Sequence, residues 1–275
     1  HDRFLNLQLY EATTTVKQCS ITAAGSGFAV GDLITFQGGH RAYKYPQDAE
    51  ASVMAVDAGG GITEIRMDNY GSHYQTAPTS ILTDGTGVGA SFACTLQSDT
   101  EVAMVPAINY REYGRLNKQY LPNDNREGGV PDPTTVGPDW IQIGSESGFL
   151  AKPAVLPNFP VTYLLDPTQF NVGNVVDGTL RMGPAERADV IIDFCQYAGK
   201  TLIMYNDAPA AYPAAVSNND YYTGSPDLRD AGGHAGVVPG MSPNTRTVMQ
   251  IKVNAGSGSC NNYNLAALQD EFKST

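Results

Sequence analysis

Apolar and polar residues alternate with a period of two along several short stretches of this 275-residue chain. The clearest case is Ala188–Phe194, which follows a Gly183-Pro184 turn and has an apolar residue at every second position. This pattern predicts a half-buried strand of an antiparallel sheet. A second strand, Thr201–Tyr205, follows the turn at 197–200, and we expect the two strands to pair as a hairpin.

Other segments show the same alternation, and one shows a different period. In Phe4–Glu11, the leucines at 5, 7 and 9 share one side, and this leucine side is expected to face a core. Further strands are predicted at 140–143, 161–165, 178–182 and 245–253. Near the C-terminus, Leu265, Leu268 and Phe272 recur at helical spacing, which predicts a short amphipathic helix.

A glycine-rich region from about residue 16 to residue 96 repeats itself. Ala24–Gly39 matches Tyr70–Gly85: each has Gly-Ser, an aromatic residue two positions on, a turn, a strand and another turn. An Ala-Ser pair then opens a second strand in each copy. We infer a duplicated β module at residues 16–99 that buries Phe28 and Tyr74 against each other or against a shared sheet.

Composition supports an all-β protein and limits its partners. Turn-forming Gly and Pro number 29 and 17, and Tyr outnumbers Phe by 15 to 9. With 28 Asp and Glu against 17 Lys and Arg, the net charge is −11. Nucleic acid and anionic lipid both require a basic face, so neither is an expected partner. The chain has no apolar run of the roughly 18 residues needed to span a membrane.

The four cysteines bear on the cellular compartment of the protein, but they do not determine which cysteines form disulfides. No Cys-X-X-Cys is present, which disfavours a zinc site or a thioredoxin-like redox pair. Cys19 and Cys94 bracket the repeated module and could close it, and Cys195 could bond to Cys260. Four cysteines allow three pairings, and four buried free thiols are the alternative. We expect at least one disulfide, and hence a periplasmic or secreted protein.

Three motifs stand in order in the second half of the chain. They are Trp140-Ile-Gln-Ile-Gly-Ser-Glu-Ser-Gly-Phe-Leu150, Gly183-Pro-Ala-Glu-Arg-Ala-Asp-Val-Ile-Ile-Asp-Phe194 and Asn206-Asp-Ala-Pro209. In this order they resemble the second cupredoxin domain of bacterial multicopper oxidases, with laccase-like and manganese-oxidising members closest. The resemblance covers about residues 137–255 and the strand near the N-terminus.

The resemblance implies a cupredoxin-like Greek-key β-sandwich or barrel with an inserted small β domain. Residues 1–15 and 100–275 would form the cupredoxin-like domain, and residues 16–99 would be the insertion in one of its loops. Insertions at exposed loops cost little stability, because the entropy of loop closure grows only slowly with length. In this family the second domain carries no copper.

For the parent protein, the resemblance implies copper-dependent one-electron oxidation of a small-molecule or metal-ion substrate, coupled to reduction of dioxygen to water. A type 1 copper takes two imidazoles and a thiolate, and the family supplies its other imidazoles from His-X-His motifs in the first and last domains. The histidines here are His1, His40, His73 and His234, and no His-X-His occurs. We expect no copper in this chain and no activity from it alone. Its partners would be the flanking copper-binding cupredoxin domains of the same parent chain, and a homo-oligomer stays open.

Other polar residues are interpreted as structural. Arg187 is expected to form an ion pair with Asp189 or Asp207 at the strand ends, and Trp140, the single tryptophan, to fill a core. Asp189 and Asp193 would lie about 13 Å apart along a strand, too far for a glycosidase pair. No catalytic or metal-binding residue is therefore assigned.

Two further expectations concern histidines. His40 is predicted to be exposed in a turn, and His234 to lie in a mobile loop. His73 takes the place of a glycine in the second copy of the repeat.

A non-enzymatic surface or adhesion protein that binds glycan or a protein partner is the alternative function. Exposed aromatic side chains at Tyr43, Tyr45 and Tyr74 would favour it. Burial of Tyr74 together with Phe28 would count against it.

Overall fold

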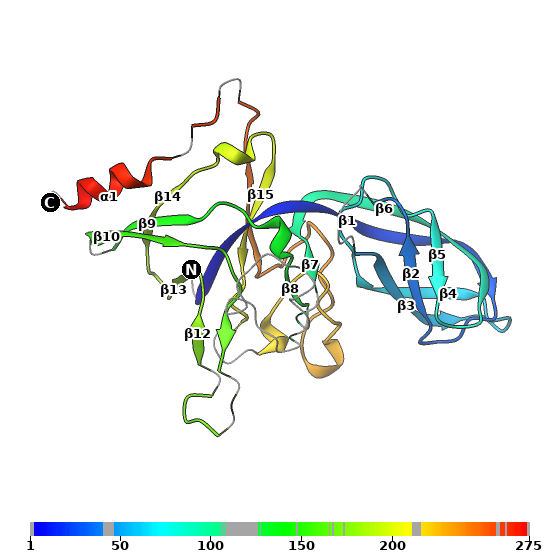
Figure 1. Ribbon diagram of the computed structural model, residues 1–275. Helices are drawn as coiled ribbons and strands as arrows, with labels where there is room; N and C mark the ends of the chain where they lie inside the picture. Colours follow the sequence, from blue (N-terminus) through cyan, green and yellow to red (C-terminus); the bar gives the residue numbers. More distant parts are fainter. Residues whose placement is uncertain are drawn as a thin grey trace. The chain divides into compact units, whose positions relative to one another are not determined.

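Strand pairing dominates the computed structural model of the chain (Figure 1). The structure describes residues 3–40, 47–105, 107, 126, 128–146, 148–164, 166, 168–172, 174–210, 216–256, 259–261 and 263–273. Only the backbone is described for residues 162, 163, 176, 177 and 217. The described residues form several antiparallel sheets and one short α-helix, which confirms the all-β class.

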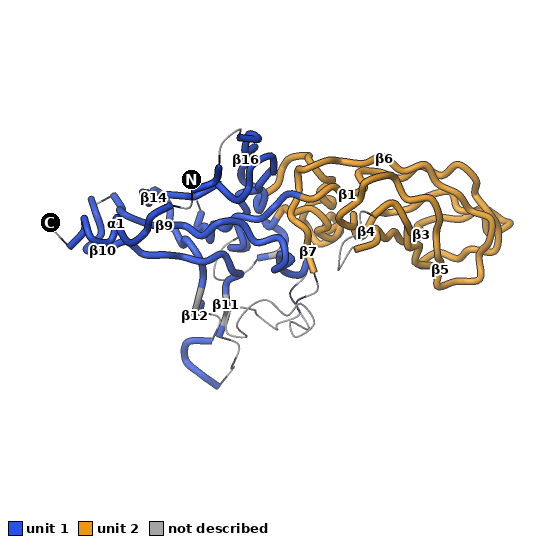
Figure 2. The backbone as a smooth tube through the Cα atoms, turned by 45° about the horizontal axis from the view of Figure 1, so that its top comes forward, with its two compact units in different colours: residues 1–12, 106–220, 245–275 blue, residues 13–105, 221–244 orange. Residues whose placement is uncertain are grey.

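The chain divides into two compact units, coloured in Figure 2. Unit 1 comprises His1–Ala12, Pro106–Asp220 and Thr245–Thr275, and unit 2 comprises Thr13–Val105 and Tyr221–Asn244. Residues 221–244 thus group with the glycine-rich region, whereas the sequence placed them in the cupredoxin-like domain. Within the described residues, no helix has the length and apolar character needed to cross a membrane.

The strand that begins unit 1 continues into unit 2, and the remaining elements belong to one unit each. This strand is β1 (Leu5–Ser26). In unit 2 the other strands are β2 (Leu33–Gln37), β3 (Ala49–Val56), β4 (Ile62–Asn69), β5 (Ser80–Thr83), β6 (Val88–Val102) and β7 (Met104–Val105). In unit 1 the further elements are β8 (Val130–Pro131), β9 (Trp140–Ser145), β10 (Gly148–Leu156), β11 (Thr162–Tyr163), β12 (Val175–Asp177), β13 (Leu180–Met182), β14 (Ala188–Ile192), β15 (Thr201–Asn206), β16 (Thr247–Lys252) and α1 (Leu265–Lys273).

Two antiparallel sheets of unit 1 share one core. One sheet has the order β13-β1-β15-β16 and the other the order β10-β9-β14. Leu7, Leu9 and Leu180 from the first sheet are buried together with Trp140 from the second. Side chains from β14, β15 and β16 complete the cluster, so apolar faces from both sheets meet as in a β-sandwich.

The predicted hairpin of Ala188–Phe194 with Thr201–Tyr205 is wrong. β14 pairs with β9, in the register Ile192↔Trp140, whereas β15 pairs with β1 and β16. A 3-10 turn at Cys195–Tyr197 and the bend after it separate the two strands. These two strands are adjacent in sequence but belong to different sheets. The alternation within each strand does not show that the chain crosses from one sheet to the other.

Unit 2 contains the repeated module. One of its sheets has the order β4-β3-β2-β5, and β6 pairs with β1. β2 and β5, which hold corresponding places in the two copies, pair antiparallel with Phe36 opposite Ile81. Phe28 and Tyr74 are 4% and 1% exposed and belong to the same core.

The loops that begin the two copies have matching backbone geometry. Gly25 and Gly71 have φ values of +67° and +64°, in the left-handed region that favours glycine. A Cβ at Gly25 would lie 2.8 Å from the Phe28 ring, and one at Gly71 would lie 2.7 Å from the Tyr74 ring. His73, with φ +58°, has the left-handed backbone expected of a residue that replaces a glycine.

Candidate functional site

The largest concentration of buried polar side chains in unit 1 begins on the far side of β1 from its leucines. Asn6 and Gln8 have no exposed surface, and Tyr10 is 1% exposed. Because Leu7 and Leu9 are buried on the opposite face, β1 is covered on both sides. The side-chain oxygens of Asn6 and Gln8 accept hydrogen bonds from Thr179 N and Tyr10 Oη, which join this face to its neighbours.

Asn206, the last residue of β15, joins three segments. Its Oδ1 accepts hydrogen bonds from the backbone N–H groups of Asn6 at 2.9 Å and Ala208 at 3.1 Å. Its Nδ2 donates to the carbonyl oxygens of Ala208 and Thr245. Asn6 Oδ1 in turn accepts from Thr179 N at 2.6 Å. The Asn206-Asp-Ala-Pro209 motif therefore has a structural function that follows from its amide.

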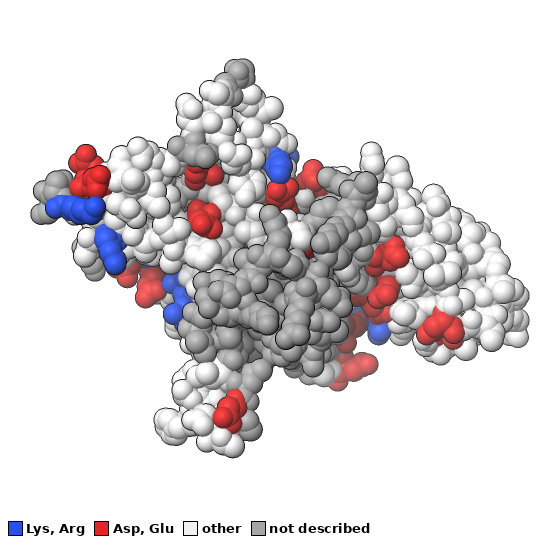
Figure 3. Space-filling view, in the orientation of Figure 1, with Lys and Arg blue, Asp and Glu red and all other residues white. Residues whose placement is uncertain are grey.

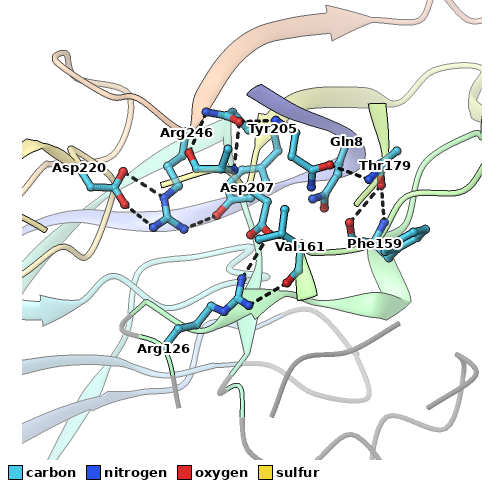
Figure 4. Close-up of polar contacts among 12 residues, drawn as sticks. Gln8, Arg126, Phe159, Val161, Thr179, Tyr205, Asp207, Asp220 and Arg246 are labelled. Carbon is cyan, nitrogen blue, oxygen red and sulfur yellow. Dashed lines mark hydrogen bonds and ion pairs between the residues drawn. The ribbon is translucent and has the colours of Figure 1, made fainter. Parts of the chain in front are cut away.

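Asp207 is fully buried. Its Oδ2 accepts from Val161 N at 2.6 Å and lies 3.3 Å from Arg126 Nη1. Arg126 Nη2 also donates to Val161 O at 2.9 Å, as Figure 4 shows. A buried carboxylate requires a cation and donors of this kind, because its desolvation is costly.

Arg246 and Asp220 form the second buried ion pair. Arg246 Nη2 lies 2.5 Å from Asp220 Oδ2, and Arg246 Nε lies 3.3 Å from Oδ1. Thr245 Oγ1 donates to the same carboxylate at 2.9 Å. Arg246 Nη1 donates to Tyr205 Oη at 3.4 Å (Figure 4). The fork of the guanidinium matches the carboxylate, which is the strong geometry for such a pair.

Burial and charge set the protonation of this network. Burial raises the pKa of Tyr205 to about 12, opposed by Arg246 and assisted by Asp207. Burial, together with Asp207 and Tyr205, raises the pKa of Tyr10 well above its ordinary value. Burial alone lowers the pKa of Arg246, but Tyr205 and Asp220 raise it well above its usual range. The two phenols therefore stay neutral and the guanidinium charged at neutral pH.

The network suits a structural role better than a catalytic one. Each of its two carboxylates has a guanidinium, so the four charges are balanced. Within this network, the shifted pKa values of Tyr10, Tyr205 and Arg246 all move away from neutral pH, where a general acid or base would titrate. The arrangement fixes β1, β15 and the segment around Arg246 relative to one another.

The residues predicted to be structural lie in different surroundings, some exposed and some buried. Arg187 and Asp189 are exposed, and Arg187 forms no ion pair with Asp189 or Asp207, so that pairing is wrong. Arg187 instead donates its backbone N–H to Glu146. Asp207 instead forms an ion pair with Arg126, which lies far from it in the sequence. The spacing of residues along the chain did not predict this partner.

Trp140 lies in the core of unit 1, 1% exposed. Its Nε1 donates to Asn158 Oδ1 at 3.0 Å, and the same oxygen accepts from Leu9 N at 2.8 Å. Asn158 Nδ2 donates to Pro138 O at 2.8 Å. Asn158 thus joins the two sheets through one amide, and the sequence did not single it out.

The histidines of unit 2 are more enclosed than predicted. The His40 side chain is only 13% exposed, with Nε2 at 2.7 Å from Asp48 Oδ1 and its ring stacked on Tyr74 at 4.2 Å. His234 is 9% exposed and stacks on Tyr221 with ring centroids 3.9 Å apart. The prediction that His40 is exposed is wrong, and the loop that holds His234 buries the side chain. His1, Tyr43 and Tyr45 lie outside the described residues.

The described side chains do not fit a copper centre. Cys19 is bonded to Cys94 and Cys195 to Cys260, so no thiolate remains for a type 1 site. In the part of the chain that the structure describes, no three His, Cys, Asp or Glu side chains gather as a metal ion requires. No step of an oxidation is therefore assigned to these residues.

Fold and site together define an all-β protein with a two-sheet unit, a glycine-rich β unit and a buried, charge-balanced network. No family model and no solved structure matches the chain. Over 84 residues it is 29% identical to multicopper oxidase LPR1 of Arabidopsis thaliana, a match covering 30% of this chain and 11% of that protein. Over 78 residues it is 32% identical to multicopper oxidase LPR2 of the same plant, covering 28% and 10%. The chain spans about a tenth of the length of these relatives, and it is distantly similar to multicopper oxidases over that part.

Proposed function

We propose that this chain is the copper-free second cupredoxin domain of a multicopper oxidase of the laccase-like or manganese-oxidising kind, with a duplicated β module inserted in it. The observation that carries the proposal is the similarity to two multicopper oxidases in a chain without a single His-X-His motif. The two-sheet core of unit 1, with strands from both ends of the sequence, agrees with a cupredoxin-like sandwich.

In this proposal the chain supplies scaffold, and the parent protein supplies the chemistry. The flanking cupredoxin domains hold the copper ions that take one electron at a time from a small-molecule or metal-ion substrate and reduce dioxygen to water. The balanced ion pairs of Asp207 and Asp220 keep this domain rigid without offering a redox group. One surface of the chain would form a wall of the substrate approach.

The proposed location is periplasmic or extracellular. The two disulfides support it, because such bonds persist in oxidising compartments. The proposal includes no nucleic-acid partner, because the net charge is −11 and the described Lys and Arg side chains do not gather into a patch on the face seen in Figure 3.

Copper analysis of the purified chain tests the proposal. After incubation with Cu²⁺ and desalting, elemental analysis should find far less than one copper per chain, and a phenolic substrate should not be oxidised. The parent protein should hold copper and oxidise the same substrate under the same conditions. One tightly held copper per isolated chain, or turnover by it, would contradict the proposal.

The alternative, a surface or adhesion protein, has less support. Tyr74, one of the aromatic residues that would have to be exposed, is buried in the same core as Phe28. Its hydroxyl accepts a hydrogen bond from Ala49 N at 2.8 Å and so is directed into the unit.

A further inference from the structure

We propose that the disulfide between Cys195 and Cys260 is a redox-sensitive latch. It holds the C-terminal arm, which comprises the described residues of 259–273 and includes α1, against unit 1. A dithiol reductant would release the arm and leave the folded core intact. This inference is independent of the proposed oxidase function.

The two disulfides differ in access to solvent. Cys19 is 7% exposed in the core of unit 2, and Cys94 is half-buried and packs against that core. Cys260 is exposed and Cys195 is half-buried in the 3-10 turn after β14. Thiol–disulfide exchange requires that a thiolate reach a sulfur atom, and exposed disulfides are the labile ones. Of the two cysteines in this bond, Cys260 is therefore the more exposed residue.

Apart from the disulfide, the contacts described for the arm lie at the surface of unit 1. None of the nine residues of α1 is buried. Phe272 packs edge to face on Phe149 of β10, with ring centroids 6.0 Å apart, and Phe149 itself remains 79% exposed. At the start of the arm, Tyr263 N donates to Asp193 Oδ2 at 2.8 Å on the surface. Figure 1 shows α1 beside β10.

A helix this short is marginal in water when it is isolated, because the cost of nucleation is repaid by few hydrogen bonds. The bond to Cys195 keeps the arm near β10 and so raises the local concentration of α1 there. Without the bond, the arm is attached to unit 1 by the chain that continues from β16. We therefore expect α1 to detach and fray on reduction.

The exchange is balanced with a dithiol as the reductant. One thiolate of the dithiol attacks Cys260 Sγ, the S–S bond breaks, and Cys195 leaves as a thiolate that takes up a proton. The second thiol then attacks the mixed disulfide and releases Cys260 as a thiol. Two electrons and two protons pass to the protein, and the dithiol becomes a cyclic disulfide.

Graded reduction of the native protein with dithiothreitol tests the latch. Free thiols are trapped by alkylation and located by mass spectrometry. Labelling of Cys195 and Cys260 should reach half at a dithiothreitol concentration at least about tenfold below that for Cys19 and Cys94. Equal labelling of all four cysteines over one concentration range would overturn the proposal.

Hydrogen exchange then tests release of the arm in the wild-type protein reduced at Cys195 and Cys260 alone. The amides of α1 should exchange at least about tenfold faster, while those of β9 and β15 stay unchanged. The Cys195→Ser/Cys260→Ser variant should reproduce the change without reductant. The Cys19→Ser/Cys94→Ser variant is the matched control and should leave α1 exchange as in the wild type. Unaltered α1 exchange after selective reduction would show that the disulfide does not hold the arm.

Discussion

Arg246 Nη2 lies 2.5 Å from Asp220 Oδ2, across 26 residues of sequence, and the two side chains are 8% and 4% exposed. Asp220 is the last residue of unit 1 before the chain enters unit 2, and Thr245 is the first residue after it returns. The ion pair therefore joins the two points of unit 1 between which residues 221–244 leave and return. The buried pair therefore has a structural role, which is to hold these two points of unit 1 together.

Arg246→Met should destabilise unit 1 strongly. The substitution leaves the Asp220 carboxylate buried without its guanidinium, which costs about 3–5 kcal/mol. Urea unfolding followed by the fluorescence of Trp140, the single tryptophan, reports on unit 1. Arg246→Met/Asp220→Leu should recover part of the loss, because it removes both charges. Arg229→Met, which breaks an exposed pair with Asp227, is the control and should change stability little.

Asn158→Leu should weaken the joint between the two sheets of unit 1. Leucine has a similar volume but leaves the N–H groups of Leu9 and Trp140 without the oxygen that they share. Each buried unsatisfied donor costs about 1–3 kcal/mol. Urea unfolding should show a loss in that range or above it, together with changed Trp140 fluorescence in the native state. Asn171→Leu, at an exposed position, is the control, and equal stability of the two variants would contradict the role of Asn158.

The alternation of apolar residues was sufficient to find most strands of unit 1, because a strand's period is a local property of the backbone. β9, β14, β15 and β16 all lie where the sequence predicted strands, and the leucines of β1 face the core. The C-terminal helix also lies at the predicted residues. At 161–165, by contrast, the strand is reduced to Thr162–Tyr163.

The alternation of apolar residues does not predict contacts between residues that are distant in the sequence. Asp207 was recognised as structural, but its cation, Arg126, comes from 81 residues away, and nothing in the spacing indicates it. Asn6 and Gln8 lie opposite the leucines on the same strand, yet neither has any exposed surface. Whether a polar face meets water or a hydrogen-bonding neighbour is decided by tertiary packing, which a two-residue period does not encode.

Tyr74→Phe tests the hydrogen bond that distinguishes the second copy of the repeat from the first. The variant makes the second copy resemble the first, where the corresponding residue is Phe28. It removes the oxygen that accepts from Ala49 N at 2.8 Å, so unit 2 should lose about 1–3 kcal/mol. Hydrogen exchange of the β3 amides measures this loss. Phe28→Leu, in the other copy, should destabilise unit 2 without selectively speeding exchange of the Ala49 amide. Equal exchange rates of this amide in the two variants would contradict the prediction.

Alkaline pH should destabilise unit 1 through Tyr205. An unfolded tyrosine ionises near pH 10, whereas burial raises the pKa of Tyr205 to about 12 in the fold, against the effect of Arg246. A folded-state pKa above the unfolded value means that the folded state binds the proton more tightly. The resulting stabilisation is complete below about pH 10 and is lost as pH rises through about 12, a change of about 3 kcal/mol.

Urea unfolding at a series of pH values, followed by Trp140 fluorescence, measures this loss. Tyr205→Phe should be less stable at neutral pH, because Arg246 loses a partner, but its stability should fall less steeply between about pH 10 and 12. Tyr263→Phe, at an exposed position, should keep the steep fall of the wild type. The same slope in Tyr205→Phe and the wild type would show that ionisation of Tyr205 does not govern alkaline unfolding.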